Sequence, residues 1–362
     1  MNAIRATIDI DDAESLIAAD REALLRSAAM AGAQVRSTAA ALNEGALDSV
    51  RGPDRPRTVV WVAGRGTAAT AGAMLASALG GLAAEPVVVA AEAPPWIGTL
   101  DVVVVAGDDP GDPALVDAAA TGVRRGARVV VAAPWEGPLR DTTAGRVAVL
   151  EPRVRVPDEF RLSRYLAAGL AVLRSVDAGL KTDLAALADE LDNEALQNSA
   201  GREVFTNPAK ALAERVSGHR VALAGDCAAT LALARHGSSV LLRIGHQVAA
   251  ASGLADALLA VQETAAFGDP ADALFHDEEI DGPLPERLRV LALTLAAERP
   301  VVAARIAGLT DVDLVGVEDI SQLTDGPAGA STPAGVRRAE QQLAILAVRL
   351  EMAAVYLRLV RG

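Results

Sequence analysis

Two glycine-containing loops carry the residues best suited to binding an anion. The first, Gly64-Arg65-Gly66-Thr67, directly follows a run of apolar residues, and the second, Gly107-Asp108-Asp109, follows another such run. In open parallel sheets, ligands bind beyond the carboxyl ends of the strands, where glycine turns let backbone amides and a helix N-terminus meet a negative charge. Both loops are therefore candidate ligand-binding segments. For the first loop, the alternative is a tight strand-to-helix turn that binds nothing.

The two loops differ in the ligands that they favour. The first falls short of a dinucleotide-binding motif, because no acidic residue ends the second predicted strand, residues 86–90. The second is acidic, since Asp108, Asp109 and Asp112 place up to three carboxylates at its mouth. Carboxylates repel a phosphate unless a cation lies between them. The loop is therefore either a divalent metal site or a turn in which residues 109–112 begin and cap the next helix.

Composition narrows the chemistry available to the rest of the chain. The 362 residues carry a formal net charge of −13, and 51% of them are apolar. This acidic balance argues against a nucleic-acid partner or an anionic membrane surface, since both require a basic face. The single cysteine, Cys227, excludes an internal disulfide and a multi-cysteine metal site, and we expect it to be a small buried apolar residue. We expect neither a metal nor a cofactor.

The sequence also predicts the cellular location. No basic N-terminal segment precedes an apolar stretch, and the chain contains no run of about 18 apolar residues, the length that a membrane-spanning helix needs. We therefore expect a cytoplasmic protein that does not cross a membrane.

The elements that must position the two loops alternate along the first half of the chain. Valine-rich runs predict strands at 58–63, 86–90, 101–106 and 128–132. Such continuous apolar runs are typical of strands buried on both faces, and their alternation with helices predicts a parallel α/β sheet. Because consecutive parallel units place their loops on one edge, Gly64–Gly66 and Gly107 should lie side by side at adjacent strand ends.

The same alternation repeats in the second half. Strands are predicted at 219–224, 289–293 and 313–317, and helices at 162–173, 184–191, 228–235, 300–307 and 339–360, with 240–244 either a strand or a helix end. Residues 15–42 predict one long or two short helices interrupted at Gly32, and residues 322–335 predict a mobile loop. The fold class expected is α/β, with two doubly wound parallel-sheet domains, residues 1–175 and 176–362, and flanking N- and C-terminal helices.

Taken in order, these segments resemble the sugar isomerase (SIS) domain family. The resemblance rests on residues 62–67, 93–97, 101–112 and 124–131 in the first half, and on 207–213, 275–282 and 355–360 in the second. More narrowly, the chain resembles the bifunctional phosphoglucose/phosphomannose isomerases, which have two such domains, in an actinobacterial mannose-6-phosphate-isomerase-like branch. The resemblance implies an aldose–ketose isomerase of hexose 6-phosphates, active in mannose metabolism through an enediol without a cofactor.

The resemblance also implies an oligomeric state and a set of site residues. It implies a homodimer in which the histidine block around His276 reaches the partner subunit's site. The ligand-binding candidates are Gly64, Arg65, Gly66, Thr67, Gly107, Asp108, Asp109 and Arg161. The catalytic candidates are His276, whose alternative is an exposed loop histidine, and His246, which could act as a base in place of a missing glutamate.

The chain departs from the family at several of the positions that carry the reaction. Residues 106–112 contain no hydroxyl where the family grips phosphate, and residues 244–250 contain no carboxylate where the family has its proton-transferring glutamate. The chain ends at Gly362, before the family's catalytic lysine, and Arg161 is offset from the family's arginine. We therefore expect a sugar-phosphate-binding protein of impaired or absent activity, a pseudoenzyme. The alternatives are an active hexose-6-phosphate isomerase and a protein that retains the fold to bind a partner.

Overall fold

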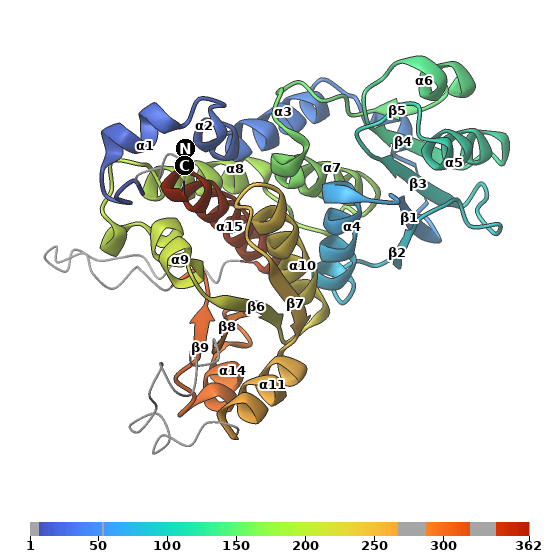
Figure 1. Ribbon diagram of the computed structural model, residues 1–362. Helices are drawn as coiled ribbons and strands as arrows, with labels where there is room; N and C mark the ends of the chain where they lie inside the picture. The colour runs from blue at the N-terminus through green and yellow to red at the C-terminus, as the bar shows by residue number, and fades with distance from the viewer. Residues whose placement is uncertain (1–6, 53, 267–286, 319–337, 362) are drawn as a thin grey trace, which may run out of the picture. The chain divides into compact units, whose positions relative to one another are not determined.

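The computed structural model describes residues 7–52, 54–266, 287–318 and 338–361 (Figure 1). They form two compact units, each built on its own parallel sheet. The five-stranded unit comprises residues 23–196 and 339–348, and the four-stranded unit the described residues within 1–22, 197–338 and 349–362. Each unit is assembled from segments that are separated in the sequence. The division of the chain into two continuous domains, 1–175 and 176–362, stays a prediction.

The five-stranded unit has the strand order β2-β1-β3-β4-β5, with every neighbouring pair parallel. Its strands are β1 (Thr58–Val62), β2 (Val87–Ala90), β3 (Asp101–Ala106), β4 (Arg128–Ala132) and β5 (Ala148–Val149). Its helices are α2 (Leu24–Ala29), α3 (Ala31–Asn43), α4 (Gly66–Leu79), α5 (Pro113–Arg124), α6 (Gly137–Thr143), α7 (Leu162–Val176) and α8 (Leu184–Gln197). The prediction of a parallel α/β sheet with adjacent β1 and β3 is confirmed.

Helices cover both faces of this sheet, because the buried strands are apolar on both sides. Alternate valines of β1, β3 and β4 pack with Leu115 of α5 and Leu139 of α6. On the other face Trp61 lies against α4 and α7, where Gly72 and Gly169 leave room for its ring. A Cβ on Gly72 would lie 2.3 Å from the Trp61 ring, so a side chain there is sterically excluded.

The four-stranded unit has the order β7-β6-β8-β9, again entirely parallel. Its strands are β6 (Arg220–Gly225), β7 (Ala249–Gly253), β8 (Leu288–Leu293) and β9 (Val312–Val315). Its helices are α1 (Ala13–Ala19), α9 (Pro208–Val216), α10 (Ala228–Arg243), α11 (Leu254–Ala266) and α14 (Arg299–Ile306). Residues 240–244, predicted as a strand or a helix end, close α10. Helix α15 (Ala339–Arg361) contributes residues 339–348 to the five-stranded unit and the rest to this one.

The N-terminal helices differ from their prediction. The helical region is broken at Ala23, which has a left-handed backbone, and at Met30, so three helices replace the one or two expected. Gly32 does not interrupt the region but lies in α3, where a Cβ would come 1.9 Å from Asp192 of α8. The glycine therefore permits close packing of two helices. The mobile loop predicted at 322–335 lies outside the described residues.

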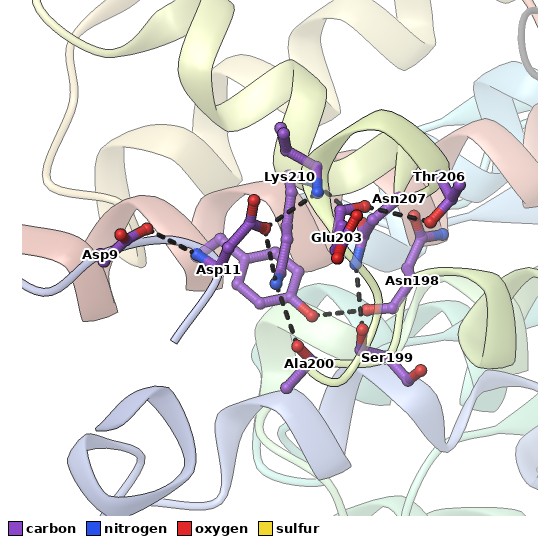
Figure 2. A network of polar contacts seen from close by, with 11 residues as sticks. Asp9, Asp11, Asn198, Ser199, Ala200, Glu203, Thr206, Asn207 and Lys210 are labelled. Carbon is purple, nitrogen blue, oxygen red and sulfur yellow. Dashed lines mark hydrogen bonds and ion pairs between the residues drawn. The ribbon is translucent and has the colours of Figure 1, made fainter. Parts of the chain in front are cut away.

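Within the four-stranded unit, a buried polar network ties the N-terminal segment to α9 and α15 (Figure 2). The fully buried Lys210 of α9 donates through Nζ to the Ala200 carbonyl at 3.0 Å and pairs with Asp11 at 3.3 Å. Tyr356 of α15 lies beside this ammonium and donates its hydroxyl to the Asn198 carbonyl at 2.6 Å. Buried charges are tolerated when paired and hydrogen-bonded in this way, so the network has a structural explanation. Among the described helices, none is both long and apolar enough to cross a membrane.

Candidate functional site

The two glycine loops lie side by side at the carboxyl edge of the five-stranded sheet. β1 and β3 are parallel neighbours in register, with Val62 opposite Val105, so both chains leave the sheet at the same edge. The predicted placement of Gly64–Gly66 beside Gly107 is therefore confirmed, for the reason given from topology.

The turn from β1 into α4 is open to solvent. Gly66 has φ +66°, and no atom lies within 4 Å of the position that a Cβ would take there. Arg65 holds the N-cap position, where its side chain has no acceptor and makes no capping hydrogen bond to α4. The first amides of α4 therefore keep the partial positive charge of a helix N-terminus. The Arg65 side chain is 75% exposed, and its Nη2 lies 3.6 Å from a carboxylate oxygen of Asp109 and 3.6 Å from one of Asp112.

The acidic loop is built mainly as a turn and a helix cap. Asp109 accepts a hydrogen bond from the Gly111 amide at 2.8 Å, and Asp112 accepts one from the Ala114 amide at 2.9 Å. Asp112 is the N-cap of α5, with Pro113 in the first turn, so the turn-and-cap interpretation of this segment is confirmed. In the part of the chain that the structure describes, no three potential metal-ligating side chains gather. The metal hypothesis is therefore not supported.

Asp108 makes a different set of contacts. Its Oδ1 accepts from Arg161 Nη1 at 2.6 Å and from the Tyr165 hydroxyl at 2.7 Å. Arg161 is fixed in turn by Nε, which donates to the Val156 carbonyl at 3.0 Å. Burial, to which the Asp108 charge adds, raises the pKa of Tyr165 although Arg164 opposes the shift, so the phenol stays a hydrogen-bond donor. The Asp108 and Arg161 side chains are 30% and 28% exposed, and solutes can reach both.

The segment that precedes α7 closes a further side of the site. Thr67 Oγ1, at the start of α4, donates to the Asp158 carbonyl at 3.3 Å. Residues 156–161 thus lie against both the β1 and the β3 loops. The eight predicted ligand-binding residues, from Gly64 to Arg161, all belong to the five-stranded unit, and these contacts bring their loops together.

Neither predicted catalytic histidine belongs to the residues that form the five-stranded unit. His246 is exposed and follows α10 in the four-stranded unit, with a left-handed φ of +50°. His276 lies outside the described residues, so its expected reach into a partner subunit stays a prediction. No histidine occurs in the sequence of the five-stranded unit. The described site can bind anionic groups and hydroxyl groups, but the five-stranded unit supplies no imidazole to act as a base.

Tyr165 is the site residue that the sequence analysis missed. It lies in α7, whose residues from Leu162 to Leu173 are all buried, and an aromatic residue in such a helix is typical of core. Only the contact with Asp108 across 57 residues reveals its role. No local sequence signal could have indicated that contact.

Known structures share this architecture over nearly the whole chain. No family model and no curated protein matches the sequence. A candidate phosphosugar isomerase from Clostridium difficile 630 superposes with a TM-score of 0.61 at 11% identity, covering 94% of this chain and 93% of that one. The chain has the SIS-type fold. Tagatose-6-phosphate ketose/aldose isomerase from Escherichia coli gives a TM-score of 0.58 at 13% identity, covering 100% of this chain and 95% of that one.

A third similar structure is one domain of a larger protein. The C-terminal domain of glucosamine-fructose-6-phosphate aminotransferase from Francisella tularensis gives a TM-score of 0.56 at 11% identity, covering 94% of this chain and 96% of that one. At such identities the likeness establishes the fold, whereas function has to be argued from the site. The two-domain SIS-type fold expected from the sequence is confirmed, and the finer branch remains a prediction.

Proposed function

We propose that this protein binds a sugar phosphate or a related phosphate ester at the carboxyl edge of the five-stranded sheet, and that it isomerises hexose 6-phosphates slowly or not at all. The observation that carries the proposal is Arg65, an exposed guanidinium at the uncapped start of α4. A guanidinium grips phosphate through two parallel hydrogen bonds, and a helix N-terminus adds backbone donors. Solved proteins of this fold include, by their descriptions, a tagatose-6-phosphate ketose/aldose isomerase and a glucose-6-phosphate isomerase-like protein.

The contacts of Arg65 leave it available to a ligand. Its two ion pairs are 3.6 Å long, and the Asp109 partner is more than half exposed. Exposed pairs of this kind contribute at most about 1 kcal/mol, so an incoming phosphate can displace them at small cost. Asp109 and Asp112 keep their backbone hydrogen bonds when the arginine turns away. The turn is therefore preorganised for binding without depending on Arg65.

Weak turnover follows from what the described site lacks. An aldose–ketose isomerase must move a proton between C1 and C2 of the open sugar, and a positioned base typically contributes about 10²- to 10⁴-fold to such a step. The five-stranded unit has no histidine, and Asp108 is held by Arg161 and Tyr165. Losing one preorganised electrostatic contact as well removes about 10²- to 10³-fold, so the combined deficit is about 10⁴-fold or more.

The test combines binding with turnover. Glucose 6-phosphate, mannose 6-phosphate and fructose 6-phosphate are titrated calorimetrically into wild type, Arg65→Gln and the matched control Arg140→Gln, which removes an exposed arginine of α6 in the same unit. We expect binding in wild type and the control, and at least a tenfold loss in Arg65→Gln, the equivalent of about 1.4 kcal/mol. Binding of none of the three sugars to wild type would contradict the proposal.

A coupled assay addresses the catalytic half of the proposal. Turnover at about 1 s⁻¹ or above, within the ordinary range for enzymes, would instead favour the active hexose-6-phosphate isomerase. His246→Ala and His276→Ala would then identify the base, since one of the two should reduce kcat while leaving KM nearly unchanged. Binding without turnover supports a sensor or carrier of the sugar phosphate.

A further inference from the structure

The Asp108 carboxylate lies where an anionic ligand group would accept hydrogen bonds from Arg161 and Tyr165. Arg161 and Tyr165 both direct a hydrogen atom at its Oδ1, at 2.6 and 2.7 Å. A phosphate oxygen would require donors of the same kind at the same distances. The position beside β3 that could hold a ligand's anionic group is thus already filled by the chain's own carboxylate.

We propose that Asp108 is a specificity-determining residue that excludes phosphate from Arg161, so that the ligand's phosphate binds at Arg65 and its hydroxyl groups bind at Asp108. This inference rests on the proposed function, because it assigns orientation and ligand class at the same site. The ligand class is a polyol monophosphate, with one anionic end and neutral hydroxyls at the other.

The charges around the β3 loop support this assignment. Within the described part of the chain, the three carboxylates of Asp108, Asp109 and Asp112 form ion pairs with two guanidiniums, those of Arg65 and Arg161. A dianion brought next to Asp108 would therefore meet an excess of negative charge at short range, where the repulsion is strong and poorly screened. At Arg65 the uncapped amides of α4 reduce that repulsion.

The contacts of Arg161 prevent it from turning towards a ligand. Its Nε donates to the Val156 carbonyl while Nη1 donates to Asp108, so the guanidinium is held at two points. Tyr165 is fully buried in α7 and cannot move away from Asp108. A phosphate would have to break these contacts and leave the Asp108 carboxylate without donors, which is unfavourable for a partly buried charge.

The second carboxylate oxygen explains the choice of hydroxyl groups. Asp108 Oδ2 receives no hydrogen bond within the described part of the chain, while the side chain is 30% exposed. An ionised carboxylate accepts hydrogen bonds only, and a sugar hydroxyl can donate one without adding charge. This second carboxylate oxygen therefore suits a neutral polyol and repels a phosphate.

Charge removal at Asp108 tests the inference. Inorganic phosphate is titrated calorimetrically into wild type, Asp108→Asn and Asp117→Asn; the control removes the same charge from an exposed position on α5. We expect Asp108→Asn to bind phosphate at least about tenfold more tightly than wild type and control, because Arg161 becomes available and one repulsive charge disappears. The double variant Asp108→Asn/Arg161→Gln should lose that gain.

The opposite results overturn the inference. If Asp108→Asn binds phosphate no better than Asp117→Asn, or if the gain survives in the double variant, Asp108 does not exclude phosphate from Arg161. Asp108→Ser, which leaves a hydroxyl for Arg161 and Tyr165 to contact, repeats the test should the asparagine variant fail to fold. If wild type binds a sugar phosphate but Asp108→Asn does not bind inorganic phosphate more tightly, this inference alone is contradicted. If Asp108→Asn does bind inorganic phosphate more tightly but wild type binds no sugar phosphate, the proposed function alone is contradicted.

Discussion

The two sheets of this protein share a strand order but differ at the turn that follows their equivalent central strands. β1 and β6 each lie between the next two strands of their sheet, in the orders β2-β1-β3 and β7-β6-β8. The turn after β1 is open, with unoccupied space at Gly66 and no capping hydrogen bond from the N-cap residue of α4. The turn after β6 is closed, as its contacts show.

Two features close the turn after β6. A Cβ on Gly225 would lie 2.3 Å from the Leu231 amide nitrogen, so helix α10 packs directly on the strand end. Cys227 and Thr230 form a capping box, in which the Cys227 amide donates to Thr230 Oγ1 at 3.1 Å. Cys227 is partly exposed and caps α10. The expectation of a small buried apolar cysteine is therefore wrong.

The difference shows that topology alone does not make a binding site. Both strand ends meet the general rule that ligands bind beyond the carboxyl edge of an open parallel sheet. At β6 the helix N-terminus is already capped and the backbone leaves no space, whereas at β1 neither holds. Local turn chemistry is therefore the reason why the proposed ligand site is placed at β1 and not at β6.

The largest expected effect concerns the glycines of the two turns. Gly225→Ala should destabilise the protein by about 3 kcal/mol or more, because the Cβ meets backbone atoms that cannot change rotamer. Gly66→Ala should lose only about 1–2 kcal/mol, because the space is open and only the left-handed backbone disfavours a side chain. Urea denaturation followed by circular dichroism measures both.

Tryptophan fluorescence assigns each loss to a unit. Trp61, Trp96 and Trp135 are the three tryptophans of the chain, and all belong to the five-stranded unit. Gly66→Ala should shift the fluorescence transition, and Gly225→Ala should mainly shift the circular dichroism. Equal losses in the two variants would remove the distinction between an open and a closed turn.

The strands that carry these turns could be predicted from the sequence, but some of their neighbours could not. The runs in β1, β3 and β4 are rich in valine, which favours strands buried on both faces. β7 was missed because Ala249–Gly253 contains only alanine, serine and glycine, none of which favours a strand. Its place in the sheet comes from pairing with β6, a tertiary contact that outweighs local propensity.

The candidate site shows the same limit. Parallel topology was sufficient to predict that the loops at Gly64 and Gly107 meet, since it depends only on strand order. The contacts of Asp108 with Arg161 and Tyr165 join residues 53 and 57 positions apart. Such contacts depend on how α7 packs on the sheet, which no spacing in the sequence encodes. The sequence therefore indicated the acidic character of the β3 loop but not the hydrogen bonds of Asp108.

The amino ends of the two sheets can be compared through one aspartate in each unit, Asp101 and Asp313. Asp101 is fully buried at the start of β3 and accepts hydrogen bonds from Arg57, Thr58 and the Gly98 amide. Burial alone would raise the pKa of Asp101, but these donors outweigh it and lower the pKa below its usual value. In the four-stranded unit, Asp313 of β9 pairs with Arg289 at 3.0 Å and is partly exposed.

The lowered pKa fixes the direction of the pH dependence. Asp101 stabilises the folded protein above its unfolded pKa of about 3.9, and this contribution is lost as the pH falls through the lower folded value. Asp101→Asn should therefore destabilise by about 2 kcal/mol at pH 7, and the difference from wild type should shrink below about pH 4. Asp313→Asn should cost less than about 1 kcal/mol. Urea denaturation between pH 3 and pH 7 checks this, and a pH-independent Asp101→Asn loss would contradict it.

The smallest expected effect exchanges the capping chemistry of α4 and α10. Arg65→Ser introduces an acceptor at the N-cap of α4, and it should stabilise the five-stranded unit by about 1 kcal/mol while abolishing phosphate binding. Thr230→Val removes the acceptor that holds the Cys227 amide in α10, and it should destabilise the four-stranded unit by about the same amount without changing binding. Together the two variants separate stability from the proposed phosphate binding, because an uncapped helix end leaves its first amides available to a ligand. Arg65→Gln distinguishes the new cap from the mere loss of charge, since it should lose binding without gaining stability. If Arg65→Ser kept phosphate binding, or if it were no more stable than Arg65→Gln, the uncapped start of α4 would not be the feature that distinguishes the two strand ends.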